Sequence, residues 1–128
     1  MNYMTALRQA TAQIQAAGVD DEAEAQAGLR LACLAFRSPT ASDQAWALLG
    51  LELLSVLAEL YPDPAPVAII AAQPSTVGPP VRAAVFDLVR VLAEGYERAS
   101  AQPQLASGRR FAYAGAASRL HSAARGLA

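Results

Sequence analysis

Apolar residues recur at intervals of three and four along most of this chain, which is the pattern of amphipathic α-helices. The first such stretch predicts a helix over 2–17 that ends at Gly18. The second predicts a helix that is capped by Asp20 or Asp21 and ends just before Pro39, because the residue before a proline is pushed out of the α region. The N-terminal third of the chain is therefore expected to form two consecutive helices.

The stretch 43–60 is the most apolar part of the chain. On a helical wheel at 100° per residue its polar side chains fall on one narrow face. That face holds Gln44, Leu48, Glu52, Ser55 and Glu59. A helix with so thin a polar strip is expected to be surrounded by other helices. We therefore expect 43–60 to be the centre of the fold.

The second half of the chain predicts two further long helices, over 80–101 and 109–125. Between 60 and 80 lie two proline-rich breakers, and the apolar residues between them, 64–72, fit either a short helix or a buried strand. No internal repeat or linker divides the chain. The predicted fold is all-α: one compact domain over 1–128, a bundle of five to six helices around the central apolar helix at about 43–60.

Composition supports a helical, folded protein. Alanine makes up about a quarter of the 128 residues, hydrophobic residues 54% and charged residues 16%, which excludes a disordered chain. The longest apolar region is interrupted by glutamates and is too short to span a bilayer, and the N-terminus lacks the apolar run of a secretory signal. All ten cations are arginine, which fits the codon usage of a GC-rich bacterial genome. A soluble cytoplasmic protein that does not engage a membrane is the expectation.

Charge is segregated along the chain. Residues 1–97 hold all eleven carboxylates and five arginines, a net charge of −6, whereas 98–128 hold five arginines and no acid, a net charge of +5. This asymmetry predicts that the C-terminal helix meets an acidic partner, either the body of its own chain or another molecule. Its arginines are scattered around the helical wheel, which favours several separate carboxylates such as Glu52, Glu59 or the acidic start of the second helix.

Catalytic and metal-binding patterns are weak. The chain has one histidine, His121, and one cysteine, Cys33, and no Gly-rich phosphate loop or nucleophile elbow. A carboxylate–histidine metal motif is also missing, so no metal and no cofactor are predicted. The sequence does not decide whether the protein is an enzyme, but with no catalytic constellation in it a non-enzymatic protein is the expectation. Four carboxylates at the start of the second helix argue against reading DNA with it.

These observations favour a small intracellular interaction or regulatory protein that docks a helix face on a protein partner or on a second copy of itself. The expected anchors are Tyr113 and Leu120, flanked by Arg109, Arg110 and Arg119. One alternative is a binder of nucleic acid or another polyanion through the C-terminal arginines. The other is a small-molecule-binding or enzymatic bundle with an apolar pocket near Trp46 and Tyr96.

Overall fold

The computed structural model describes residues 2–36, 44–62 and 77–126. These residues form five α-helices and one short 3₁₀ helix, and no strand occurs among them. The elements are α1 (Tyr3–Ala17), α2 (Glu22–Cys33), η1 (Leu34–Phe36), α3 (Gln44–Leu60), α4 (Pro79–Ser100) and α5 (Ser107–Arg125). The predicted all-α bundle is confirmed. The choice between helix and strand for 64–72 lies outside the described residues.

Local sequence signals set the helix ends. The side chain of Asn2 accepts a hydrogen bond from the Thr5 backbone N–H (2.8 Å), and the Asp21 carboxylate caps α2 by accepting from the Ala23 and Glu24 N–H groups. Asp21, rather than Asp20, is thus the cap of the second helix. Gly18 ends α1 with φ +75°, a conformation that favours glycine, and its N–H donates to the Ile14 carbonyl (2.7 Å).

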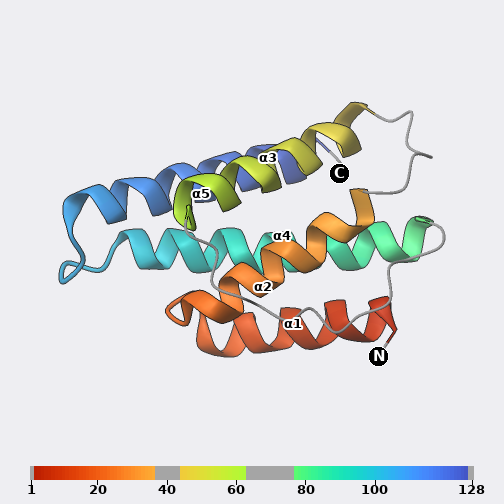
Figure 1. The fold of residues 1–128 in the computed structure, drawn as a ribbon, viewed down its shortest axis with the longest axis horizontal. Coiled ribbons are helices and arrows are strands. Elements are labelled where there is room, and N and C mark those ends of the chain that lie inside the picture. Colours follow the sequence, from red (N-terminus) through yellow and green to blue (C-terminus); the bar gives the residue numbers. More distant parts are fainter. Residues whose placement is uncertain (1, 37–43, 63–76, 127–128) are drawn as a thin grey trace.

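The helix at the centre of the bundle is α4. It packs against α1, α2 and α5, and its contact with α5 is the most extensive in the molecule. Figure 1 shows α4 running through the middle, with α1 below it, α2 crossing it obliquely, and α3 and α5 above it. Alanines on the inner face of α5, including Ala116, Ala117, Ala123 and Ala124, are buried and allow the two backbones to approach closely.

The expectation that 43–60 is the central helix was wrong. Among the described residues, α3 packs mainly on α5 and α2, so one of its sides has no helical neighbour. Its inner face is buried and includes Trp46, Leu49, Leu53, Val56 and Leu60. The reason is geometric: the amphipathic α4 is 22 residues long and offers several neighbours a continuous apolar surface, whereas α3 reaches the core from one side only.

The loop between α1 and α2 packs on α4 because position 95 has no side chain. A Cβ built at Gly95 would lie 2.8 Å from Cγ1 of the buried Val19, which is closer than real Cβ contacts. A Cβ at Gly28, on α2, would lie equally close to Cδ1 of Ile14, but that atom is the far end of a longer side chain. The two glycines therefore differ in how easily the neighbour can move.

We expect Gly95→Ala to lower the free energy of unfolding by about 1–3 kcal/mol, because the β-branched side chain of Val19 has little rotational freedom. Gly28→Ala is the matched control. Rotation at the end of Ile14 relieves its contact, and alanine gains about 1 kcal/mol of helix propensity over glycine. Urea denaturation of both variants measures the difference. Equal destabilisation by the two substitutions would contradict this account of the α1–α2 loop.

Candidate functional site

Arg109, in the first turn of α5, connects three parts of the chain. Its guanidinium donates one hydrogen bond to the backbone carbonyl of Leu60 (2.9 Å), at the end of α3, and another to the carboxylate of Glu22 (2.9 Å), at the start of α2. The same group lies over the rings of Tyr113 (4.7 Å) and Tyr61 (5.7 Å). Arg109 is therefore held by its own chain.

A cluster of three tyrosines lies beneath this arginine. The hydroxyl groups of Tyr61 and Tyr96 are 3.0 Å apart and hydrogen-bonded, and the rings of Tyr96 and Tyr113 are stacked at 5.6 Å. Burial raises the pKa of Tyr61 to about 12, although its hydrogen bond to Tyr96 opposes the shift. Burial likewise raises the pKa of Tyr96 well above its ordinary value. Tyr61 and Tyr96 therefore satisfy each other's hydroxyl groups inside the fold.

The remaining residues of the predicted partner surface are divided between the core and the surface. Leu120 is fully buried, whereas Arg119 is half-exposed and pairs with the carboxylate of Glu59 on α3 (2.6 Å). Arg110 is half-buried, and its Nε has no hydrogen-bond partner among the described residues. Because Tyr113 and Leu120 both face the core, they stabilise this protein rather than form a docking surface.

The predicted attraction between the two ends of the chain is confirmed by two ion pairs, Arg109 with Glu22 and Arg119 with Glu59. In addition, Nε2 of His121 lies 3.2 Å from the carboxylate of Glu97 on α4. The C-terminal helix is thus packed on the acidic body of its own chain.

The structure does not bring Trp46 and Tyr96 into one pocket. Trp46 lies in the first turn of α3, where its ring stacks on Phe36 (4.2 Å) under the guanidinium of Arg82 (5.0 Å). Tyr96 instead bonds Tyr61, which follows the last residue of α3. A helix of 17 residues is roughly 25 Å long, so the two aromatic side chains lie near opposite ends of α3. Both are buried in the core.

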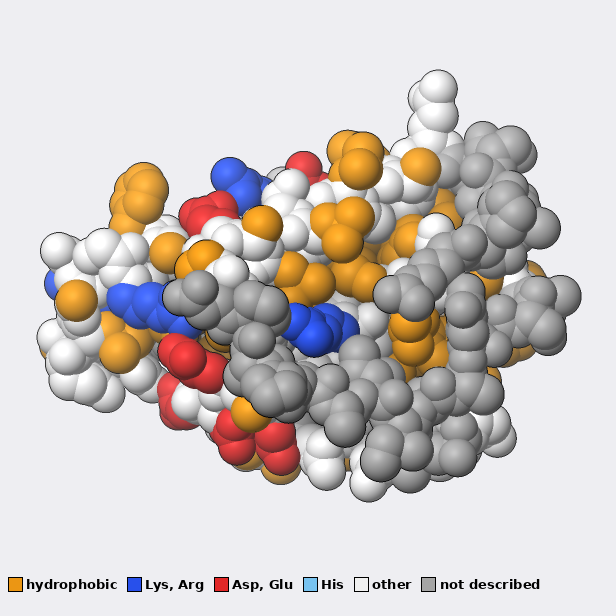
Figure 2. Space-filling view, viewed as in Figure 1, with side chains coloured by type: hydrophobic (Ala, Val, Ile, Leu, Met, Phe, Trp, Pro, Cys, Tyr) orange, Lys and Arg blue, Asp and Glu red, His pale blue; other side chains and the backbone are white. Residues whose placement is uncertain are grey.

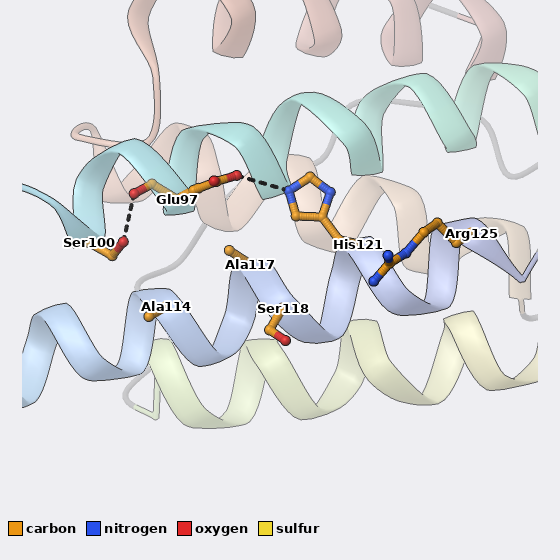
Figure 3. Close-up of a pocket in the computed structure, with 7 residues that line it drawn as sticks. All are labelled: Glu97, Ser100, Ala114, Ala117, Ser118, His121 and Arg125. Carbon is orange, nitrogen blue, oxygen red and sulfur yellow. Dashed lines mark hydrogen bonds and ion pairs between the residues drawn. The ribbon is translucent and has the colours of Figure 1, made fainter.

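A shallow hollow of about 440 Å³ lies between α4 and α5, around the pair formed by His121 and Glu97. Figure 3 shows the imidazole directed at Glu97, while the Ser118 hydroxyl, one helical turn away, is joined to neither. Glu97 is 69% exposed, so water screens the pair. The guanidinium of Arg125 also lines the hollow, but no base within the described part of the chain is hydrogen-bonded to the Ser118 hydroxyl to activate it as a nucleophile.

Within 2–36, 44–62 and 77–126, no three side chains of histidine, cysteine, aspartate or glutamate converge closely enough to hold a metal ion. Over the same ranges, none of the helices has both the length and the apolarity to cross a bilayer.

The most unusual surface is the outer face of α3. Leu48, Leu51 and Leu54 are 52%, 62% and 56% exposed, and in Figure 2 their side of the molecule carries a group of apolar side chains. The other exposed residues of α3 are Gln44, Ala47, Ser55, Ala58 and, at the edge, Glu59. We call the three leucines together with Gln44, Ala47, Ser55 and Ala58 the outer face of α3. Contiguous exposed leucines mark interaction surfaces more often than isolated ones do.

Sequence reasoning missed this face because it treated apolar residues all around a helix as a sign of burial. Leu48 was assigned to the polar strip, and Leu51 and Leu54 were not singled out. The useful signal was that the three leucines lie within about 120° of one another on the wheel, opposite Leu49 and Leu53. That signal separates two apolar faces, but it does not say which one finds a neighbour.

Comparison with known proteins adds nothing to this description: no family model, no curated protein and no solved structure matches the chain. The function is therefore argued from the surface of the molecule.

We expect Arg109→Ala to lower the free energy of unfolding by about 2–3 kcal/mol, because it removes two charge-assisted hydrogen bonds and the ring contacts. The adjacent Arg110→Ala is the control and should change stability by no more than about 0.5 kcal/mol. Arg109→Lys keeps the charge but loses the planar pair of donors, so it should fall between them. Urea denaturation measures all three. Equal effects at positions 109 and 110 would show that the contacts of Arg109 contribute little.

The buried tyrosines predict a loss of stability at high pH. A folded-state pKa above the unfolded value means that the folded state holds its proton more tightly, so the stabilisation is complete below pH 10 and is lost as the pH rises towards about 12 for Tyr61. Between its unfolded-state and folded-state pKa values, each such tyrosine lowers the free energy of unfolding by about 1.4 kcal/mol per pH unit. The chain has no lysine, so tyrosines dominate the titration in this range.

Tyr61→Phe should therefore be about 1 kcal/mol less stable at neutral pH, because the Tyr96 hydroxyl loses its partner, but should lose stability less steeply above pH 10. Denaturation series between pH 7 and 11, with tyrosinate absorbance followed in parallel, test both effects. Parallel loss of stability in the two proteins would contradict the role given to Tyr61.

Proposed function

We propose that this chain is a small non-enzymatic interaction protein that docks on a protein partner through the outer face of α3. The observation that carries the proposal is that Leu48, Leu51 and Leu54 are each more than half exposed on a well-formed helix. Burying a leucine side chain completely contributes roughly 1.5–3 kcal/mol. Three such side chains on one face are enough to drive association with a complementary surface.

The surroundings of this face support a role in specific docking. Glu59 lies at its edge and pairs with Arg119 of α5, and both side chains remain partly exposed. Apolar centres with polar rims are typical of protein interfaces. In this proposal the leucines supply the energy and the Arg119–Glu59 pair restricts the approach of the partner. These residues replace Tyr113 and Leu120 as the proposed anchors.

The two alternative functions have less support. A polyanion would have to compete with Glu22 and Glu59 for Arg109 and Arg119, which leaves Arg110 and Arg125 as the more available arginines of α5. An enzyme or a small-molecule binder would need an enclosed, preorganised site, and the hollow at His121 is open to solvent. We also propose a cytoplasmic protein of bacterial origin, supported only by the arginine-rich, lysine-free composition and the single cysteine.

Photo-crosslinking inside the cell tests the docking proposal. A photoreactive phenylalanine analogue at Leu51 or Leu54 should give adducts with protein, whereas the same analogue at the exposed Gln13 on α1 should not. Leu51→Glu should reduce the adducts formed from position 54 at least tenfold while changing stability by about 0.5 kcal/mol or less, because position 51 is exposed. Adducts at Gln13 equal to those at Leu51 and Leu54, or adducts with nucleic acid alone, would overturn the proposal.

A further inference from the structure

We infer that the partner on the outer face of α3 is a second copy of this chain, with the two α3 helices antiparallel and a twofold axis passing beside Leu51. The inference rests on the proposed function, to which it adds the identity of the partner. It comes from the order of large, small and charged residues along α3.

The first argument is the symmetry of the face. In a contact across a twofold axis, if a first residue of one copy meets a second residue of the other copy, then the second residue of the first copy also meets the first residue of the other copy. Antiparallel pairing about Leu51 matches residues that are equally far from it in the two directions, and every exposed position between 44 and 58 has such a match. Leu51 meets its own counterpart. The pairs brought to the same height along the helices are Gln44 with Ala58, Ala47 with Ser55, and Leu48 with Leu54.

The second argument is complementarity of size. On a helical wheel at 100° per residue, Leu48 and Ser55 lie on one side of Leu51, and Ala47 and Leu54 lie on the other. Twofold rotation therefore places Leu48 beside Ser55 of the second copy, and Ala47 beside Leu54 of the second copy. Leu48 and Leu54 thus each meet a small side chain, whereas the two Leu51 side chains meet each other on the axis, so we expect the helix axes to lie towards the upper end of the usual range of about 8–10 Å.

The third argument concerns charge. None of the seven residues of the outer face is charged, so pairing buries no ion. Glu59, at the edge, is already paired with Arg119 of its own chain. Glu52 is half-buried and points about 100° away from Leu51, so its two copies would be about 10 Å apart, close to one Debye length at ordinary salt. Antiparallel helices also place opposite dipole ends together.

The size of the face limits the strength of this dimer. The 14 residue steps from Gln44 to Ala58 cover about 21 Å of helix, and one pair of short helices buries less than the ~800 Å² per partner of a standard interface. We therefore expect a reversible dimer with a Kd on the order of 10 µM or weaker. Such a dimer would assemble and separate as the concentration of the chain changes.

Cysteine crosslinking of the full chain tests the arrangement. In a Cys33→Ala background, whose fold is checked by circular dichroism, Leu51→Cys should form a disulfide with its own counterpart when oxidised glutathione is added. Gln44→Cys alone and Ala58→Cys alone should not crosslink, but a mixture of the two variants should. Gln13→Cys, on α1, is the control for random collision. Self-crosslinking at both 44 and 58 would indicate parallel helices and would overturn the antiparallel arrangement.

Light scattering between about 1 and 500 µM, a range chosen around the expected Kd, tests the partner itself. The chain should pass from monomer to dimer, and Leu51→Glu should weaken dimerisation at least tenfold. A chain that stays monomeric throughout, with no disulfide at Leu51→Cys, would overturn the inference. In that case photo-crosslinking to a different protein would still support the proposed docking function, whereas loss of both kinds of adduct would end both proposals.

Discussion

The contact on which this arrangement depends is the insertion of the Arg109 guanidinium between the end of α3 and the start of α2. It satisfies the backbone carbonyl of Leu60, one of the groups that a helix C-terminus leaves without an internal partner, and the carboxylate of Glu22 at the same time. Since Arg109 lies in the first turn of α5, this single side chain positions one helix against two others that are distant in sequence. The rings of Tyr61 and Tyr113 beneath it add a cation–π attraction to the contact.

This junction explains why α3 lies where it does. It is held at its C-terminal end by Arg109, along its length by α5, and near its N-terminal end by the stack of Trp46 on Phe36. All of these contacts are on the inner side of the helix. Its outer leucines have no part in these contacts and are more than half exposed. In Figure 1, α3 and α5 form an outer layer that α4 supports from below.

The sequence was informative about helices and about charge. The predicted spans 80–101 and 43–60 differ by no more than one residue at either end from Pro79–Ser100 and Gln44–Leu60, because prolines, caps and apolar periodicity are local signals. The pairing of C-terminal arginines with Glu59 and with the start of α2 was also predicted, since the segregation of charge left few other partners. These features depend on residues close in sequence or on long-range attraction between opposite charges.

What the sequence did not predict is which apolar surface meets which. A wheel shows that Tyr113 and Leu120 share a stripe, but a stripe that docks on another protein and one that packs on α4 have the same pattern. The same ambiguity led to the wrong position for α3 and to the pocket assigned to Trp46 and Tyr96. The position of a helix in a bundle depends on how several helices share a common core. The sequence of one helix alone does not contain that information.

The environment of Trp46 has a practical consequence. It is the only tryptophan in the chain, it is fully buried, and from the inner side of α3 it stacks on Phe36 of η1. Indole fluorescence therefore comes from a single place, the contact between the first turn of α3 and η1. A ligand that pulled this helix away from the bundle would change the emission, whereas one that settled on it without displacing it would leave the spectrum as it was. Tryptophan fluorescence can therefore distinguish binding that leaves α3 in place from binding that displaces it.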